Sequence, residues 1–402
     1  MEVTILQKGS NLEKITIPDP AWGSDLANII LDLEKLRTKR LGGDVPPWIF
    51  FQIKEIFQIL ETIGSARIEG NNTTLSEYVE KIIEQDSIDE QTREIQNLER
   101  AIEFIETNTD KHTHVNRAYI SELHKIISEG LTPPPRGEGS NHPGELRKHN
   151  VKIKGSSHTP PDFFQLPELF ESFVEFVNRE HKEQYQLLMV AIAHHRFEYL
   201  HLFDNGNGRM GRLLNYAFLI KLGFQVRSGR ILNPSTVFYT DRDKYYEMLS
   251  RADSLEDEDL LAWAEYFLLG LKNEIEKIDS LLQVDFVRKK LLTPMLKHAK
   301  SHAYINENEF KVLHYLVAKD NFALKAKELE DVLGVVESKK KSLAISKMRQ
   351  RRILMPIEEG RRVYTLAFGN NYLLRSMVSV LHDNGFVSNF LEQKPKNKST
   401  PL

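Results

Sequence analysis

The chain has 402 residues, with 54 lysines and arginines against 57 aspartates and glutamates, and it contains no cysteine. The near-neutral balance excludes a histone-like polycation and an acidic solvating tail, so any nucleic-acid surface must be a local patch. The lack of cysteine excludes disulfide scaffolds, cysteine-ligated zinc, iron–sulfur clusters and cysteine nucleophiles, and it is typical of a reducing cytosol.

Helical periodicity dominates the first 130 residues. After a short β-like stretch at the N-terminus, apolar residues recur at three- and four-residue spacing over 48–63, which predicts an amphipathic helix. Further helices are predicted over 26–40, 77–84, 93–107 and 117–129. No run approaches the roughly 18 apolar residues of a membrane span, and no signal peptide opens the chain, so we expect a cytoplasmic protein without a membrane partner.

Residues 130–166 interrupt the helical pattern with a segment that is dense in Pro, Gly, Ser and His. Within it, residues 150–154 alternate like a short strand, which predicts a β-hairpin. Long irregular segments of this kind are more often functional than idle.

Helical patterns return after residue 166 and change in character after about residue 285. They cover 166–179, 184–199, 209–223, 243–251 and 257–282. Three shorter helices at 308–318, 326–333 and 339–352 precede a hairpin at 353–366, which is the layout of a winged helix–turn–helix. The strongly basic third helix either binds DNA phosphates or is a solvated face of a protein-binding or dimerising module.

We therefore divide the chain into four consecutive segments. They are an N-terminal helical region (1–110), a catalytic core (111–284), a winged-helix-like domain (285–370) and a C-terminal helix with a disordered tail (371–402).

Residues 201–212, HLFDNGNGRMGR, form the most informative segment. Gly206, Gly208 and Gly211 satisfy G-x-G-x-x-G, but the preceding stretch is helical, which argues against a dinucleotide-binding βαβ unit. No Lys-Ser/Thr follows the glycines, so the segment is not a P-loop either.

The chemistry of this segment still indicates a polyphosphate site. Glycines let backbone N–H groups approach a ligand, and the following helix adds its positive N-terminal end. Arg209 and Arg212 lie three residues apart on one helical face, and His201 can take a proton from an attacking hydroxyl near neutral pH.

This segment resembles the signature of the Fic family, H-x-F-x-(D/E)-G-N-G-R-x-x-R, and the resemblance extends over about residues 48–280. It implies a mainly α fold, a Fic-type helical bundle with a small β-hairpin flap, followed here by the winged helix–turn–helix. It also implies transfer of AMP from ATP, with Mg²⁺, to a Ser, Thr or Tyr hydroxyl of a target protein.

The resemblance assigns roles to the motif. His201 would be the general base and Phe203 would anchor the loop in the core. Gly206, Asn207 and Gly208 would hold the α- and β-phosphates, Arg209 the β-phosphate and Arg212 the γ-phosphate. The nucleotide site as a whole would consist of the motif residues Gly206, Asn207, Gly208, Arg209, Met210, Gly211 and Arg212. Tyr245 and Tyr246 occupy the position of a tyrosine pair beside the base, although two tyrosines on a helix are also typical of packing.

Two further segments support the resemblance. GELRKHNVKIKG followed by HTPP is similar to the family's flap, in which Asn150, Val151, Lys152 and Ile153 would pair with the target peptide. SARIEG at 65–70 fits the inhibitory motif (S/T)-x-x-x-E-(G/N), so Ser65, Glu69 and Gly70 would be inhibitory and Glu69 would pair with Arg212.

The chain departs from the signature at two positions. Leu202 replaces the usual proline, and Asn205 replaces the acidic residue that binds Mg²⁺ in the family. Asparagine offers a carbonyl oxygen without charge, so Asn205 is a weak metal ligand and the reaction itself is left open.

Three functions compete at this level. The first is an AMP-transferring enzyme with built-in inhibition. The second is a DNA-binding regulator with a nucleotide-sensing Fic-like core, and the third is a Fic enzyme that transfers another group or removes AMP. The complete set of His201, Asn207, Arg209 and Arg212 favours the first, because a sensor needs no base. The partners are an unnamed target protein and, as further candidates, a second copy of the chain and DNA.

Overall fold

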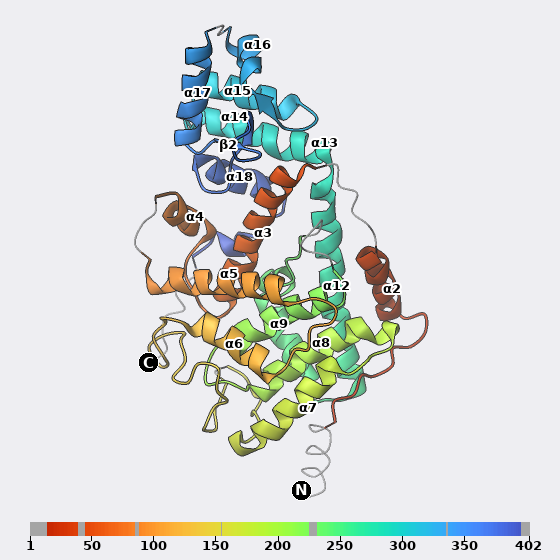
Figure 1. Ribbon diagram of the computed structural model, residues 1–402. Helices are drawn as coiled ribbons and strands as arrows, with labels where there is room; N and C mark the ends of the chain where they lie inside the picture. The colour runs from red at the N-terminus through yellow and green to blue at the C-terminus, as the bar shows by residue number, and fades with distance from the viewer. Residues whose placement is uncertain are drawn as a thin grey trace, which may run out of the picture. The chain divides into compact units, whose positions relative to one another are not determined.

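The computed structural model describes residues 14–38, 45–84, 88–153, 155–224, 231–334 and 337–394 (Figure 1). The predicted N-terminal β-like stretch and the end of the tail lie outside the described residues. The chain divides into two compact units that interleave along the sequence. The first unit consists of Met1–Lys39, Glu61–Asn72 and Asp89–Glu276, and the second of Arg40–Leu60, Thr73–Ile88 and Lys277–Leu402. The four consecutive segments expected from the sequence stay predictions.

Helices build the first unit, as the sequence predicts. They are α2 (Asp25–Thr38), the end of α3 (Pro47–Ile68), α5 (Glu90–Asn108), α6 (Arg117–Ser128), α7 (Leu166–Asn178), α8 (Glu183–Leu200), α9 (Asn207–Lys221), α10 (Thr236–Tyr239), α11 (Arg242–Ala252) and most of α12 (Asp257–Asp279). Figure 1 shows α8 and α9 among α5, α6 and α7, and each of these three helices contacts α8 or α9.

The helices α8 and α9 form the centre of this unit. From Leu187 to Phe197 every residue of α8 is buried, and α9 is buried from Arg209 to Ile220. A helix that is buried on all sides must be surrounded by other elements. A hydrogen bond also joins α12 to α8, because Nε1 of the Trp263 indole donates to the carbonyl of Ala191 at 2.7 Å. The short loop between α8 and α9 is therefore held at both ends by packed helices.

The predicted hairpin at 150–154 is wrong for the described residues, because Asn150, Val151, Lys152 and Ile153 form no strand. The side chain of Asn150 instead donates to Asp162 at 2.5 Å and accepts from the backbone N–H of Phe163 at 2.9 Å. These bonds close an irregular loop and take the place of strand pairing. Lys154, at the end of the expected strand, lies outside the described residues.

The second unit combines helices with one small sheet. Its helices are the start of α3, α4 (Leu75–Glu84), α13 (Val284–Phe286), a π-helical turn (Val287–Leu292), α14 (Thr293–Ser301), α15 (Glu307–Ala318), α16 (Leu329–Leu333), α17 (Ser338–Gln350) and α18 (Tyr372–Asp383). The strands β1 (Leu324–Lys325), β2 (Leu354–Pro356) and β3 (Val363–Leu366) form an antiparallel sheet in the order β1-β3-β2.

The element order from α15 to β3 is helix, strand, two helices and two strands. The three predicted helices and the predicted hairpin are present, while β1 and α14 were not expected from the sequence. Side chains hold the start of α3 on this sheet: Gln52 donates to the carbonyl of Leu366 at 3.1 Å and accepts from the N–H of Phe368 at 2.8 Å.

None of the helices in the described part of the chain combines the length and apolar character needed to cross a bilayer.

Candidate active site

His201 is placed by the end of α8. Its N–H donates to the carbonyl of Phe197 at 3.2 Å, and its φ of 48° puts it in the left-handed region, which is uncommon for a residue with a side chain. This turn directs the chain from α8 into the glycine-rich loop. Burial, and secondarily Arg147, lowers the pKa of His201 to about 4. The imidazole is therefore neutral near pH 7 and able to accept a proton.

Arg147 braces the backbone on either side of His201. Its Nε donates to the carbonyl of His201 at 2.8 Å and its backbone N–H donates to that of Leu202 at 2.9 Å. The rest of its guanidinium binds the carbonyls of His149 and Pro161. Arg147 thus joins the loop of the predicted base to both ends of the predicted flap. Arg147 lies in the segment that resembles the flap, but nothing in the sequence pointed to its role.

The middle of the loop is fixed by an aromatic stack. Phe203 is fully buried, and its ring lies 3.8 Å from that of His124 with the two planes nearly parallel. The side-chain amide of Asn207 bonds both the N–H and the carbonyl of Phe203 at 2.9 Å. His124 in turn bonds the carbonyl of Asn205 at 3.0 Å. Phe203 therefore occupies the anchoring position that the family resemblance implies, and Asn207 braces the loop.

Among the described residues, the N-terminus of α9 lacks a side-chain cap. Gly206 precedes the helix with a φ of 78°, and no side chain of the described residues caps it. The first N–H groups of a helix have no partner within it, and they carry its positive dipole end. At Gly208 a Cβ atom would overlap Oε1 of Glu69, so only glycine lets the carboxylate lie this close to the first turn.

Arg212 and Glu69 form a buried ion pair at this helix end. Nη2 of Arg212 donates to Oε1 of Glu69 at 2.6 Å and to the carbonyl of Ser65 at 3.0 Å, while Nε donates to the Ser65 hydroxyl at 2.9 Å. The arginine side chain is 1% exposed and the glutamate 28%. Nη1 has no hydrogen-bond partner among the described residues.

Charge and burial oppose each other in this pair. Burial alone would raise the pKa of Glu69, but Arg212 holds the pKa below its ordinary value, so the carboxylate is ionised. Burial would lower the pKa of Arg212, and Glu69 raises it above its ordinary value. The structure thus brings together Ser65, Glu69 and Arg212 as the inhibitory motif predicts. Gly70 follows with a φ of 112° and turns the chain away.

Arg209 is engaged elsewhere. Its Nη1 donates to Oε1 of Glu94 at 2.8 Å and its Nη2 to the carbonyl of Glu138 at 2.7 Å, and the side chain is 1% exposed. Glu94 also accepts from the side chain of Asn71 at 2.7 Å. Glu94 and Glu138 were not identified from the sequence, because nothing in their local pattern marks them. The expected contact of Arg209 with the β-phosphate stays a prediction.

Asn205 and its neighbour offer little to a metal ion. The Oδ1 of Asn205 accepts from the N–H of Gly206 at 2.7 Å, and its Nδ2 donates to Glu138 at 3.3 Å. The carboxylate of Asp204 accepts from Ser140 and from the N–H of Asn141. No cluster of three His, Asp or Glu side chains suited to a metal occurs in the described ranges. These residues do not fit a protein-held Mg²⁺.

The remaining residues that the sequence assigns to the site differ in burial. Met210 is fully buried, and Tyr245 is buried with its hydroxyl 3.0 Å from Nε2 of His194; their expected contacts with the nucleotide stay predictions. Tyr246 is 40% exposed, and Arg242 lies over its ring.

At Gly211 a Cβ would overlap Oε1 of Glu198, which identifies a buried carboxyl that the sequence did not single out. Glu198 lies one turn before His201 on α8. Its Oε1 has no hydrogen-bond partner among the described residues, and burial raises its pKa to about 8. The carboxyl is therefore protonated at neutral pH, despite the Arg212 guanidinium that partly opposes the shift.

With this geometry in place, the comparisons with known proteins identify the domain. Residues 114–219 match the Fic/DOC family, so the chain contains a Fic domain. The chain is homologous to Protein adenylyltransferase Fic of Drosophila ananassae, with 29% identity over 201 residues, and to that of Drosophila melanogaster, with 29% over 195 residues. These alignments cover 48% and 47% of this chain but only 36% of each relative.

The fold agrees with this assignment. The crystal structure of a Fic family protein from Desulfovibrio desulfuricans G20 is similar with a TM-score of 0.53 and 18% sequence identity. The similarity covers 88% of this chain and 98% of that chain. The predicted mainly helical Fic-type fold is confirmed.

Replacing Glu198 by Gln should change how stability depends on pH. A carboxyl whose folded pKa lies above its unfolded pKa retains a proton that the unfolded chain has released, so its contribution falls as pH rises from about 4.5 to about 8. Glu198→Gln removes this loss. We expect the free energy of unfolding of the variant to gain on that of the wild type progressively from pH 5 to pH 8, by an amount on the order of a few kcal/mol at pH 8, with a matching rise in relative Tm. Thermal unfolding of both proteins and of the exposed control Glu168→Gln measures this, and parallel pH profiles would contradict the assignment.

Proposed function

We propose that the chain is a protein adenylyltransferase that transfers AMP from ATP to a hydroxyl side chain of a target protein, and that Glu69 inhibits it. One observation carries the proposal: a neutral His201, the uncapped N-terminus of α9 and the guanidinium of Arg212 all lie on one braced segment of twelve residues. This combines a base with an anion site. The homology to protein adenylyltransferases supports the same reaction.

In the proposed reaction, His201 accepts the proton of the target hydroxyl as its oxygen attacks the α-phosphorus. The new P–O bond forms as the bond to the β-phosphate oxygen breaks, and pyrophosphate leaves. The N–H groups at the start of α9 are fixed donors for the charge that develops on the phosphate, which is usually the largest catalytic contribution. Arg147 and Asn207 act by holding the loop in place.

Inhibition follows from the ion pair. The carboxylate of Glu69 lies against Gly208 and binds Nη2 of Arg212, where the resemblance places the γ-phosphate. A second anion at this place is opposed by the charge already there. ATP in its productive pose must therefore compete with Glu69 for the guanidinium.

The first test of this function is His201→Ala. We expect the variant to keep its fold and its Tm and to lose AMP transfer by a factor of about 10² to 10⁴, the usual contribution of a general base. The assay is incorporation of label from α-³²P-ATP into the chain itself and into proteins of a cell extract. Label from γ-³²P-ATP with none from α-³²P-ATP would instead indicate phosphoryl transfer, and full transfer by the variant would exclude His201 as the base.

The second test concerns Glu69. Glu69→Gly frees Arg212 and should raise AMP transfer by about 10- to 100-fold, the equivalent of one charge-assisted hydrogen bond. Arg212→Ala should abolish activity in both the wild-type and the Glu69→Gly background. Glu168→Gln serves as the control, because it removes an exposed carboxylate on α7 that lies outside the motif and the inhibitory segment. Equal activity of Glu69→Gly and wild type at saturating ATP and Mg²⁺ would show that this contact does not inhibit.

The third test concerns Mg²⁺. A carboxylate binds this ion more strongly than a neutral amide. Asn205→Asp should therefore lower the Mg²⁺ concentration needed for half-maximal transfer in the Glu69→Gly background. A Mg²⁺ titration of both proteins measures the shift, and superimposable curves would mean that position 205 does not hold the ion.

A further inference from the structure

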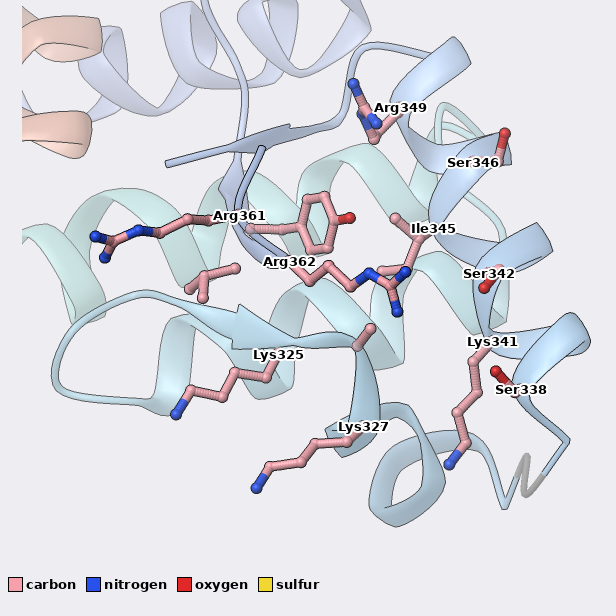
Figure 2. A pocket seen from close by; sticks show the side chains of 13 residues that line it. Lys325, Lys327, Ser338, Lys341, Ser342, Ile345, Ser346, Arg349, Arg361 and Arg362 are labelled. Carbon is pink, nitrogen blue, oxygen red and sulfur yellow. The ribbon is translucent and has the colours of Figure 1, made fainter. Parts of the chain in front are cut away.

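A large open groove lies within the second unit, between α17 and the arm formed by β1 and β3. Its volume is about 710 Å³. Figure 2 shows α17 along one side of the groove, with Lys325 at the end of β1, Lys327 on the turn that follows it, and the side chain of Arg362 directed toward α17. The groove is formed by residues of this unit alone.

Positive charge dominates the lining. The cationic residues come from three separate stretches of the chain: Lys325, Lys327, Lys341, Arg349, Arg361 and Arg362. No carboxylate is found among the described lining residues. The overall charge of the chain is −3, so this is a local concentration of positive charge on a slightly acidic protein.

Part of this charge is not neutralised by neighbours. Lys341 pairs with Glu330 at 2.8 Å, and Arg361 pairs with Glu358 at 2.7 Å. Lys327, Arg349 and Arg362 are exposed, and within the described ranges none of them has a carboxylate in ion-pair distance. Three unpaired cations around one groove are available to an anionic ligand.

The helix that borders the groove presents small hydroxyl side chains to it. Ser338, Ser342 and Ser346 are exposed and lie four residues apart, so they follow one side of α17. Serine hydroxyls donate to phosphate oxygens, and their small size lets a nucleic-acid backbone approach the helix. At 13 residues, α17 is about 20 Å long, and a helix fits the major groove of B-form DNA.

We propose that this groove binds the sugar–phosphate backbone of double-stranded DNA, with α17 against the major groove and the arm before β3 on flanking phosphates. An acidic peptide would match the charge, but the lining favours DNA. The two largest apolar side chains of the lining are buried, Ile345 at 4% and Tyr364 at 8% exposure, and the two smaller ones, Ala326 and Val363, are half-buried, so none of them forms an exposed apolar pocket for an anchoring side chain. This inference is independent of the proposed AMP transfer.

The test is binding of the full-length chain to a fluorescein-labelled 24-base-pair duplex, followed by fluorescence anisotropy between 50 and 300 mM NaCl. We expect an affinity that falls with salt, because each neutralised phosphate releases counterions. The triple variant Lys327→Ala, Arg349→Ala, Arg362→Ala should bind at least about tenfold more weakly at 100 mM salt and reduce the slope of log K against log salt by about three.

A matched variant separates the groove from the overall charge. Lys111→Ala, Lys182→Ala, Lys297→Ala removes the same number of exposed charges outside the groove and should bind DNA as the wild type does. Circular dichroism and Tm verify that both variants fold. Equal losses in the two variants, no binding by the wild type, or tighter binding of poly-L-glutamate than of the duplex at equal salt would each overturn the proposal.

Discussion

The ion pair between Arg212 and Glu69 is the contact on which the site depends. Burying an isolated guanidinium is strongly unfavourable, and removing one partner from a fully buried pair costs about 3–5 kcal/mol. The cost is smaller here, because the glutamate is 28% exposed. Ser65 adds two bonds to the same guanidinium, so the end of α3 and the start of α9 are joined by one connected set of polar contacts.

A second buried arginine repeats this arrangement one turn earlier on α9. Arg209 forms an ion pair with Glu94 on α5, and Arg212 forms one with Glu69, which follows α3. Both guanidiniums are almost fully removed from solvent, and both acids come from segments that precede the motif by more than 100 residues. The helix that carries the proposed anion site is thus positioned by charges from the N-terminal part of the chain. The difference between the two pairs is exposure: Glu94 is 4% exposed and cannot leave its partner as easily as Glu69 can.

Much of this site could be predicted from the sequence, because its chemistry lies in short local patterns. The motif at 201–212 and the spacing from Ser65 to Glu69 are both contiguous, and the helices around them follow from apolar periodicity. The supports of the site were not predictable, because Arg147 and Glu94 act through contacts between distant parts of the chain.

The errors have equally specific causes. The alternation at 150–154 predicted a hairpin, but the side chain of Asn150 bonds to Asp162 and Phe163 in place of a strand partner. The strand β1 has two residues, too few to show alternation, and it exists because β3 pairs with it. Tertiary context decided both outcomes.

The close approach at Gly208 limits how this protein could evolve. The carboxylate of Glu69, which we propose inhibits the enzyme, occupies the space that the missing side chain leaves, and the resemblance places a substrate phosphate at the same residue. A side chain at this position would displace the carboxylate of Glu69 and would stand where the proposed phosphate binds, so we expect a change here to affect the proposed inhibition and the proposed activity together. Constitutively active descendants should arise from changes in the segment 65–70, and those changes leave the glycine-rich loop intact. The proposed inhibition and the proposed activity share the space at Gly208, so mutation can remove the inhibition alone only from the side of the 65–70 segment.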